Sequence, residues 1–265
     1  MSERPLPSPV IDPTHTMADV ERIIVEAPHR FVLGSRVYDE LQGGQSVNIA
    51  AFGNIYVEMD EENLGLERVT LGNLQKGWEA QGGEFTKGLH QSGIEVDPFT
   101  AYKWYQIQRK VVQTLGPPSQ DIARQREQRN NHRVRFKLSE ARGQAVCAEY
   151  ATLSALIAQK IGEPAHLVIG SVVNEDDLDG WRAAHAFVWL DGLNAVFDSV
   201  QAQTDNEYPA IMLPKTPVNF DALEAGKDIA GQRLGTDFTL HYGLQAGGFG
   251  IDSAHQNPPS LKELS

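Results

Sequence analysis

The pattern of apolar positions is most informative between residues 143 and 200. Val146–Ile161 contains no glycine or proline and is dense in alanine and leucine, which favour helix. Its few polar residues gather on one narrow side, and the rest of the circumference is apolar. The pattern therefore predicts a largely buried helix that ends at Gly162, with Pro164 just beyond it.

A strand and a β-hairpin are predicted directly after this helix. His166–Val173 is rich in β-branched residues, as strands are. Two further apolar runs, Ala184–Leu190 and Leu193–Asp198, flank the dipeptide Asp191-Gly192. Asp-Gly between apolar runs is a strong hairpin signal, because both residues tolerate a positive φ.

The length of the turn sets the register of this hairpin. A two-residue turn at Asp191-Gly192 places His185 directly opposite Asp198, with the side chains on one face. A four-residue loop that extends to Asn194 makes the two residues diagonal neighbours on the same face. Either turn is expected to bring an imidazole and a carboxylate together.

The first half of the chain has a weaker pattern. Residues 31–94 are rich in glycine between short apolar runs, which predicts short strands and turns with some helix around Leu71–Trp78. Tyr102–Leu115 predicts a helix that ends at Gly116. Ser119 is a candidate cap for another helix through about His132.

These patterns divide the chain into four parts. Prolines among polar residues predict a flexible arm over residues 1–17 and a flexible tail over 255–265. Between them we expect an N-terminal region of unknown role at 18–115 and a catalytic core at 116–254.

Composition narrows the class of protein. The 265 residues carry a formal net charge of -12 and are 41% hydrophobic, which fits a folded chain of one large or two small domains. No apolar run is long enough for a membrane helix, and Met1–Pro5 shows no secretory signal pattern. The acidic balance opposes nucleic-acid binding. We expect no nucleic-acid or membrane partner, and a location in the cytoplasm or secretion without a readable signal; the oligomeric state stays open.

The chain has one cysteine, Cys147. This excludes an internal disulfide framework and a cysteine-rich zinc site, and it fits a reducing compartment. Cys147 lies in the first turn of the predicted helix, where unpaired amides and the helix dipole favour the thiolate, which is the nucleophilic form. A lone cysteine in an apolar helix is often an inert core residue. The predicted contact between His185 and Asp198 favours a catalytic role for Cys147, because a carboxylate orients an imidazole to act as base toward a nucleophile.

Several motifs follow one another in this part of the chain. Gly143-x-x-x-Cys147 begins the predicted buried helix. Gly162-x-Pro-Ala-x-x-Val168 ends this helix and leads into the predicted strand. Ala184-His-Ala-Phe-Val-Trp189 follows, and the next strand ends in Phe197-Asp198. Over about residues 140–200 the chain resembles the transglutaminase-like superfamily.

The resemblance implies a fold and a triad. The implied fold is α+β, with a papain-like or transglutaminase-like core in which a central helix packs on an antiparallel sheet, here with an N-terminal Gly-rich extension. The implied triad has Cys147 as the nucleophile, His185 as the base and Asp198 as the orienting acid. Animal transglutaminases carry Gly-Gln-Cys-Trp, whereas here Gln144 lies three residues before the cysteine and Ala148 follows it.

Other residues are weaker candidates for the site. The side-chain amide of Gln144 is a possible oxyanion donor, although the backbone N–H of Cys147 is the better one. Trp189 shares the face of His185 by strand parity and is a candidate wall of a substrate site, or else a core aromatic. His166 is a competing base, but no predicted turn places a carboxylate opposite it.

No metal or cofactor is expected. Asp237 and His241 are four residues apart, but their glycine-rich surroundings do not predict a stable helix, so a metal site there is not expected.

The expected function is cysteine-dependent acyl transfer on a protein or peptide amide through an acyl-enzyme. Water as the acceptor gives a protease or amidohydrolase, which we favour because water is always available. A glutamine deamidase, a cross-linking transglutaminase, and a bacterial effector or toxin are alternatives, the last by analogy alone. An alternative that is not an enzyme is a catalytically inactive transglutaminase-like module that binds other proteins. Its contact surfaces would be the acidic stretch 174–179 and the arginine-rich segment 124–135.

Overall fold

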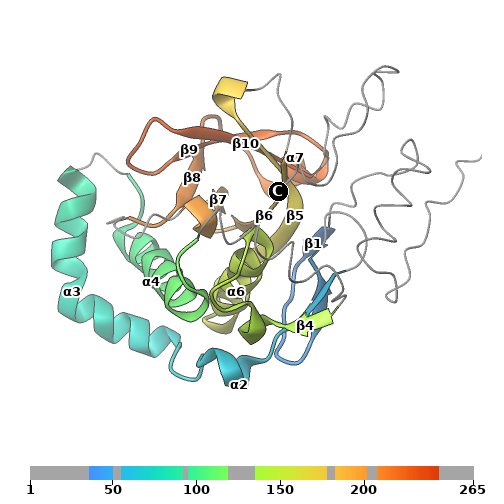
Figure 1. Cartoon of the computed structure of the whole chain (residues 1–265). Coiled ribbons are helices and arrows are strands. Elements are labelled where there is room, and N and C mark those ends of the chain that lie inside the picture. Colours follow the sequence, from blue (N-terminus) through green and yellow to red (C-terminus); the bar gives the residue numbers. More distant parts are fainter. Residues whose placement is uncertain are drawn as a thin grey trace, which may run out of the picture.

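Antiparallel strands in the second half of the chain close on themselves into a barrel (Figure 1). The strands are β5 (Ala165–Asn174), β6 (Ala183–Leu190), β7 (Ala195–Phe197), β8 (Ile211–Pro214), β9 (Ile229–Arg233) and β10 (Thr239–Gly243). Each strand pairs with the next, and β10 pairs with β5 to complete the circle. This computed structural model describes residues 36–49, 55–91, 95–118, 135–177, 183–201 and 208–244.

The closed barrel shows that the expected fold class is wrong. A papain-like or transglutaminase-like core with a helix on an antiparallel sheet does not describe this chain, because β5 pairs with both β6 and β10 and so closes the sheet beneath α6 into a barrel. Leu240 of β10 pairs with Asn174 of β5, far away in sequence. Turn chemistry predicts only neighbouring strands, so the closure was not visible in the local pattern.

The remaining strands lie outside the barrel. β1 (Arg36–Tyr38) pairs antiparallel with β5, so a strand from the region 18–115 extends the sheet of the barrel. β2 (Ser46–Asn48), β3 (Tyr56–Glu58) and β4 (Arg135–Lys137) form a separate three-stranded sheet. The short strands expected within residues 31–94 are thus present in β2 and β3.

Helices cover one side of the barrel. They are α2 (Glu61–Leu64), α3 (Leu71–Gln91), α4 (Pro98–Leu115) and α6 (Cys147–Lys160). The short helix α7 (Phe220–Glu224) precedes β9 in the chain, and the 3-10 turns are η2 (Leu138–Ala141), η3 (Glu175–Asp177) and η4 (Ser199–Gln201). The helix predicted at Val146–Ile161 is present as α6, and the one predicted at Tyr102–Leu115 is present as the last part of α4. The candidate helix after Ser119, the arm at 1–17 and the tail at 255–265 lie outside the described residues.

α3 is much longer than the helix predicted around Leu71–Trp78. Its glycines argued against a long helix, but its aromatic side chains pack on α4. The Trp78 and Tyr102 rings lie 5.4 Å apart, and the Phe85 and Tyr102 rings lie 5.5 Å apart. A side chain at Gly77 would meet the Tyr102 hydroxyl at 2.6 Å, so this glycine permits the close approach of the two helices. Tertiary packing here outweighs helix propensity.

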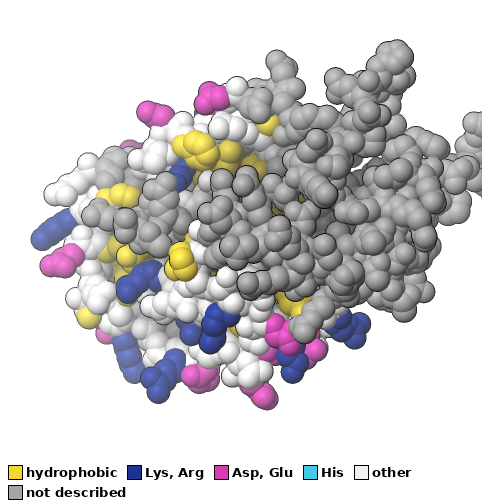
Figure 2. All heavy atoms as spheres, viewed as in Figure 1, with side chains coloured by type: hydrophobic (Ala, Val, Ile, Leu, Met, Phe, Trp, Pro, Cys, Tyr) yellow, Lys and Arg dark blue, Asp and Glu magenta, His cyan; other side chains and the backbone are white. Residues whose placement is uncertain are grey.

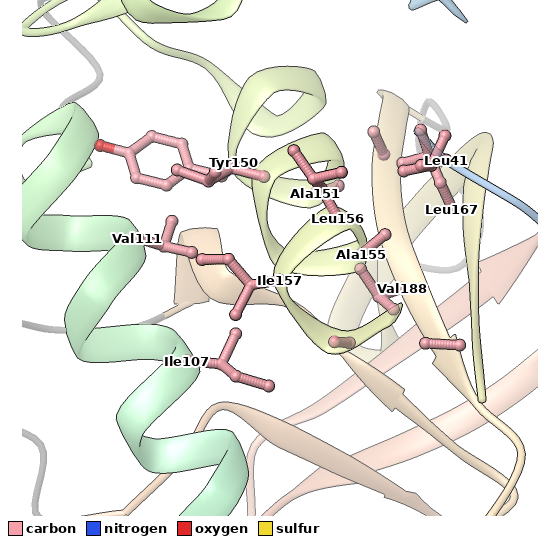
Figure 3. Close-up of a cluster of buried hydrophobic side chains, with 14 of the residues drawn as sticks. Leu41, Ile107, Val111, Tyr150, Ala151, Ala155, Leu156, Ile157, Leu167 and Val188 are labelled. Atoms are coloured by element: carbon pink, nitrogen blue, oxygen red, sulfur yellow. The ribbon is translucent and has the colours of Figure 1, made fainter. Parts of the chain in front are cut away.

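The main core lies between the helices and the outer face of β5 and β6. Figure 3 shows Val111 and Ile107 of α4 facing Ile157 of α6, while Ala155 on another side of α6 faces Val188 of β6. α6 is buried over most of its length, as its nearly continuous apolar surface predicted. The same core takes residues from before and after position 116, so the described part of the region 18–115 shares its core with the residues that follow it.

A second core fills the barrel. Every barrel strand contributes to it, through the inward-facing residues Val168, Phe187, Trp189, Val196, Met212, Ile229, Leu240 and Tyr242. The alternate residues on β5 and β6 face α6. Both faces of these two strands are therefore buried, and α6 is held firmly against the barrel wall.

Charged side chains of both signs are interspersed on the face seen in Figure 2, over the described parts of α2, α3 and α4. The arginine-rich segment 124–135 lies mostly outside the described residues, so its role as a contact surface stays a prediction. None of the helices in the described part of the chain has the length and apolar character of a membrane span.

Candidate active site

The start of α6 fixes the position of Cys147. Val146 is extended, with φ -118° and ψ -175°, and its backbone N–H donates to the Glu149 carboxylate over 3.0 Å. This interaction stops the helix from extending backwards, so Cys147 is its first residue. The first N–H groups of a helix have no carbonyl partner within it, and they lie beside the Cys147 side chain.

The hairpin that carries His185 has the longer of the two turns considered. Leu190 pairs with Ala195, so four residues separate the strands and the two-residue Asp191-Gly192 turn is wrong. Asn194 has a φ of 44°, whereas Gly192 is not in the left-handed region. A type I′ turn requires a positive φ at both central residues, and this chain instead places the left-handed residue at the end of the loop.

His185 and Asp198 therefore lie diagonally across the hairpin, on its inward face. His185 Nε2 and Asp198 Oδ2 are 2.7 Å apart. The backbone N–H of Asp198 donates to the Ala210 carbonyl over 3.0 Å, and its Oδ1 accepts from the Val200 N–H over 3.3 Å. His185 is 8% exposed and Asp198 is 1% exposed. The pair is thus a buried hydrogen bond at one end of the barrel.

Cys147 lies beside this pair. Cys147 is among the groups that raise the pKa of His185, so the two side chains lie close together. Because Nε2 is engaged by Asp198, Nδ1 is the ring nitrogen left for the sulfur. Cys147 is partly exposed, whereas His185 and Asp198 are buried, so Cys147 is the most accessible of the three side chains.

The electrostatic surroundings favour a charged imidazole. Burial alone would lower the pKa of His185, but the negative charges of Asp198 and Cys147 oppose it, as do the hydrogen bonds to both. Together they raise the pKa of His185 well above its usual value. The charged imidazolium is therefore the form of His185 that its surroundings favour.

Two further residues lie close to Asp198 and were not predicted. The Tyr242 hydroxyl on β10 donates to Asp198 Oδ2 over 2.8 Å, and Tyr242 is fully buried. Arg233 on β9 is half-buried, and burial lowers its pKa while the charge of Asp198 acts in the opposite direction. β10 lies beside the hairpin because it pairs with β5 and closes the barrel, and no short motif predicts that pairing.

The weaker candidates have other contacts in the structure. The Gln144 side-chain amide donates to the Glu140 carbonyl over 3.0 Å. Trp189 is buried in the barrel core, and its ring lies 5.8 Å from that of Phe220. It is four residues from His185, about 13 Å along the strand. Trp189 therefore occupies the position of a core aromatic.

His166 does have carboxylate neighbours, contrary to expectation. Its Nδ1 is 2.8 Å from Asp39, its Nε2 is 2.9 Å from Asp191, and its ring stacks on Phe220. Asp191 belongs to the four-residue loop, and the wrong turn length hid this contact. His166 follows the C-terminal end of α6, and the helix is about 20 Å long, so it lies far from Cys147 at the other end.

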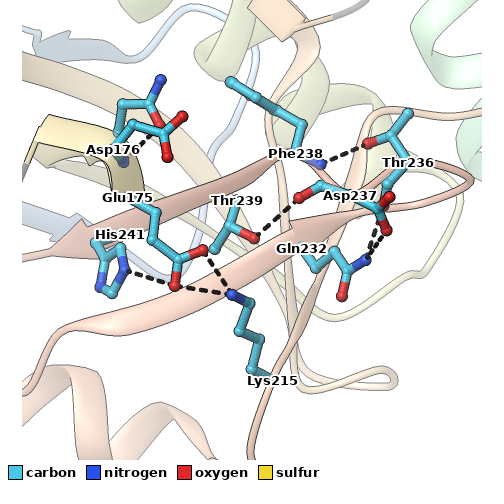
Figure 4. Close-up of polar contacts among 10 residues, drawn as sticks. Glu175, Asp176, Lys215, Gln232, Thr236, Asp237, Phe238, Thr239 and His241 are labelled. Atoms are coloured by element: carbon cyan, nitrogen blue, oxygen red, sulfur yellow. Dashed lines mark hydrogen bonds and ion pairs between the residues drawn. The ribbon is translucent and has the colours of Figure 1, made fainter.

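Asp237 and His241 face different neighbours (Figure 4). His241 Nε2 is 3.9 Å from Glu175, whose carboxylate binds Lys215 over 2.6 Å, and Asp237 is 3.5 Å from Gln232. Among the residues that the structure describes, no group of three or more His, Cys, Asp or Glu side chains is arranged to hold a metal ion.

The raised pKa of His185 predicts a pH-dependent stability. The folded protein binds the His185 proton more tightly than the unfolded chain, where the pKa of histidine is about 6.5. The contribution of this proton to the free energy of unfolding is complete below about pH 6.5 and is lost as the pH rises through the pKa of His185 in the folded protein. We expect the urea midpoint of the wild type to fall more than that of His185→Gln between about pH 6 and pH 9. An equal fall in both proteins would contradict the charged pair.

Four elements thus meet at one end of the barrel. α6 supplies Cys147, β6 supplies His185, the end of β7 supplies Asp198 and β10 supplies Tyr242. The likeness to the transglutaminase-like superfamily over residues 140–200 stays a prediction. No family model, no curated protein and no solved structure matches this chain.

Proposed function

We propose that this protein catalyses cysteine-dependent acyl transfer on a protein or peptide amide, with Cys147 as the nucleophile and water as the acceptor. The observation that carries the proposal is the position of His185, between the Asp198 carboxylate and the Cys147 sulfur. A nucleophile, a base and a group that orients the base are the set that covalent acyl transfer requires. The proposal depends on these three side chains and on no shared fold.

In the first half-reaction, the Cys147 thiolate attacks the carbonyl carbon of the amide and the C=O electrons move to the oxygen. The N–H groups of Cys147 and Ala148 at the start of α6 are the donors to this oxyanion, with that of Cys147 nearest to the sulfur. The intermediate collapses when the C–N bond breaks. The leaving nitrogen takes the proton from His185, and a thioester on Cys147 remains.

In the second half-reaction, water attacks the thioester and gives its proton to His185, which is now neutral. The C–S bond breaks, the carboxylic acid leaves, and the thiolate–imidazolium pair forms again. Asp198 keeps the ring oriented through both halves, because its 2.7 Å contact holds Nε2 and leaves Nδ1 free to exchange the proton.

Mass spectrometry of a cell lysate incubated with the protein tests the proposal and identifies the acceptor. New protein termini are the expected product and indicate a protease. A mass gain of about 1 Da on glutamine side chains indicates a deamidase, and isopeptide cross-links indicate a transglutaminase; both are acyl transfers from the same thioester.

The matched control is a lysate treated with Cys147→Ala. All product formation is expected to disappear with this variant. Products that form equally with both proteins would overturn the proposal, and so would a wild-type sample without any of the three products.

A further inference from the structure

The Tyr242 hydroxyl shares an acceptor with the catalytic imidazole. It donates to Asp198 Oδ2 over 2.8 Å, and His185 Nε2 lies 2.7 Å from the same oxygen. The Tyr242 ring is fully buried and meets the Phe187 ring edge-on, with centroids 4.9 Å apart. The hydroxyl is thus fixed by packing, and its hydrogen is directed at a carboxylate.

We propose that Tyr242 is a positioning residue of this site, which holds the Asp198 carboxylate toward His185 and limits how strongly that carboxylate holds the imidazolium. The inference rests on the proposed function. It adds a fourth member to the predicted triad, from a strand that joins the hairpin only through closure of the barrel.

The chemistry of the phenol supports this role. Burial raises the pKa of Tyr242 well above its usual value, and the charge of Asp198 raises it further. The phenol therefore stays protonated and acts only as a donor. A donor at Oδ2 withdraws negative charge from the oxygen that faces the imidazolium, so it weakens the pull of Asp198 on the His185 proton.

This balance matters for the two half-reactions. The first needs a protonated His185 to supply the leaving nitrogen, and the second needs a neutral His185 to accept a proton from water. A carboxylate that held the imidazolium too firmly would slow the second step. The groups that face His185 are Asp198, Cys147 and Tyr242, with the Arg233 cation nearby on β9.

The test compares Tyr242→Phe with Tyr150→Phe. Tyr150 is a matched control, since it is buried on α6 and its hydroxyl donates to the Gly116 carbonyl over 2.7 Å. His185 is titrated by NMR of its Cε1–H group, which is assigned from its absence in His185→Ala. We expect the midpoint to rise by about half a pH unit in Tyr242→Phe and to stay unchanged in Tyr150→Phe.

Alkylation of Cys147 by iodoacetamide at about pH 6 is the second readout. The rate is expected to rise about 2-fold to 3-fold in Tyr242→Phe, because a more stable imidazolium favours the thiolate, and to stay unchanged in Tyr150→Phe. If Tyr242→Phe does not fold, 3-fluorotyrosine at position 242 keeps the test. Its more acidic hydroxyl is a stronger donor, so the His185 midpoint is expected to fall while alkylation is retained.

The outcomes separate this inference from the proposed function. An unchanged His185 midpoint in Tyr242→Phe, or the same alkylation rate in both variants, would overturn the role of Tyr242 and leave the triad standing. For the fluorinated protein, an unchanged or raised midpoint would do the same. Alkylation that is as fast in His185→Ala as in the wild type would remove the proposed function, and the inference with it.

Discussion

Cys147→Ala is expected to lose all acyl-transfer activity while it keeps the fold. The reaction needs a covalent bond to sulfur, and Cys147 is the only cysteine in the chain. Loss of a nucleophile in comparable enzymes lowers turnover by about 10⁶-fold, so no product above background is expected. The fold is expected to survive, because Cys147 is partly exposed at the helix start and alanine favours helix.

Asp198→Asn is the graded comparison for this prediction. An amide still occupies the site of the carboxylate but carries no charge, so we expect a loss about 100-fold smaller than that in Cys147→Ala. Product formation is measured in the lysate assay, and the fold is checked by circular dichroism and urea unfolding. A Cys147→Ala protein that is unfolded, or one that keeps wild-type activity, would contradict the assignment.

Gly170→Ala is expected to destabilise the barrel by about 3 kcal/mol or more. A Cβ atom at this position would lie 2.3 Å from the Gly243 carbonyl oxygen, at the seam where β10 closes against β5. The obstacle is backbone, so no side-chain rotation relieves the clash. Gly170 also pairs with His185 across β5 and β6, so the alkylation rate of Cys147 is expected to fall with stability.

Gly192→Ala is the matched control. This glycine lies in the turn between β6 and β7, its φ is not positive, and a Cβ atom there would meet nothing within 4 Å. Its effect on the free energy of unfolding is expected to stay within about 0.5 kcal/mol. If urea unfolding gives the two variants the same stability, the close contact between β5 and β10 is not a feature of the protein.

Local chemistry was sufficient to predict α6 and the contact inside the hairpin. The uninterrupted Val146–Ile161 run determines a buried helix, and Cys147 falls at its start. His185 and Asp198 stay on the same face of the hairpin whether the turn has two or four residues. Their contact was therefore predicted correctly, although the predicted two-residue turn was wrong.

Long-range packing accounts for what the sequence did not predict. Barrel closure depends on the pairing of Tyr242 with Val172, which no periodicity encodes. The role of Tyr242 near Asp198 follows from the same closure and was missed for the same reason. The full length of α3 depends on the contact of Trp78 with α4, which outweighs the helix-breaking tendency of its glycines.

The alkylation rate of Cys147 by iodoacetamide, measured as a function of pH in the wild type and in His185→Ala, tests the thiol–imidazole pair most directly. Cys147 of the wild type is expected to react at least about 10-fold faster near pH 6 than Cys147 of the variant, with a profile that follows the titration of an imidazole. The opposite result would be an equal, slow rate in both proteins near pH 6, with a common increase only in alkaline solution, as for an ordinary thiol. That result would show that Cys147 and His185 do not act together.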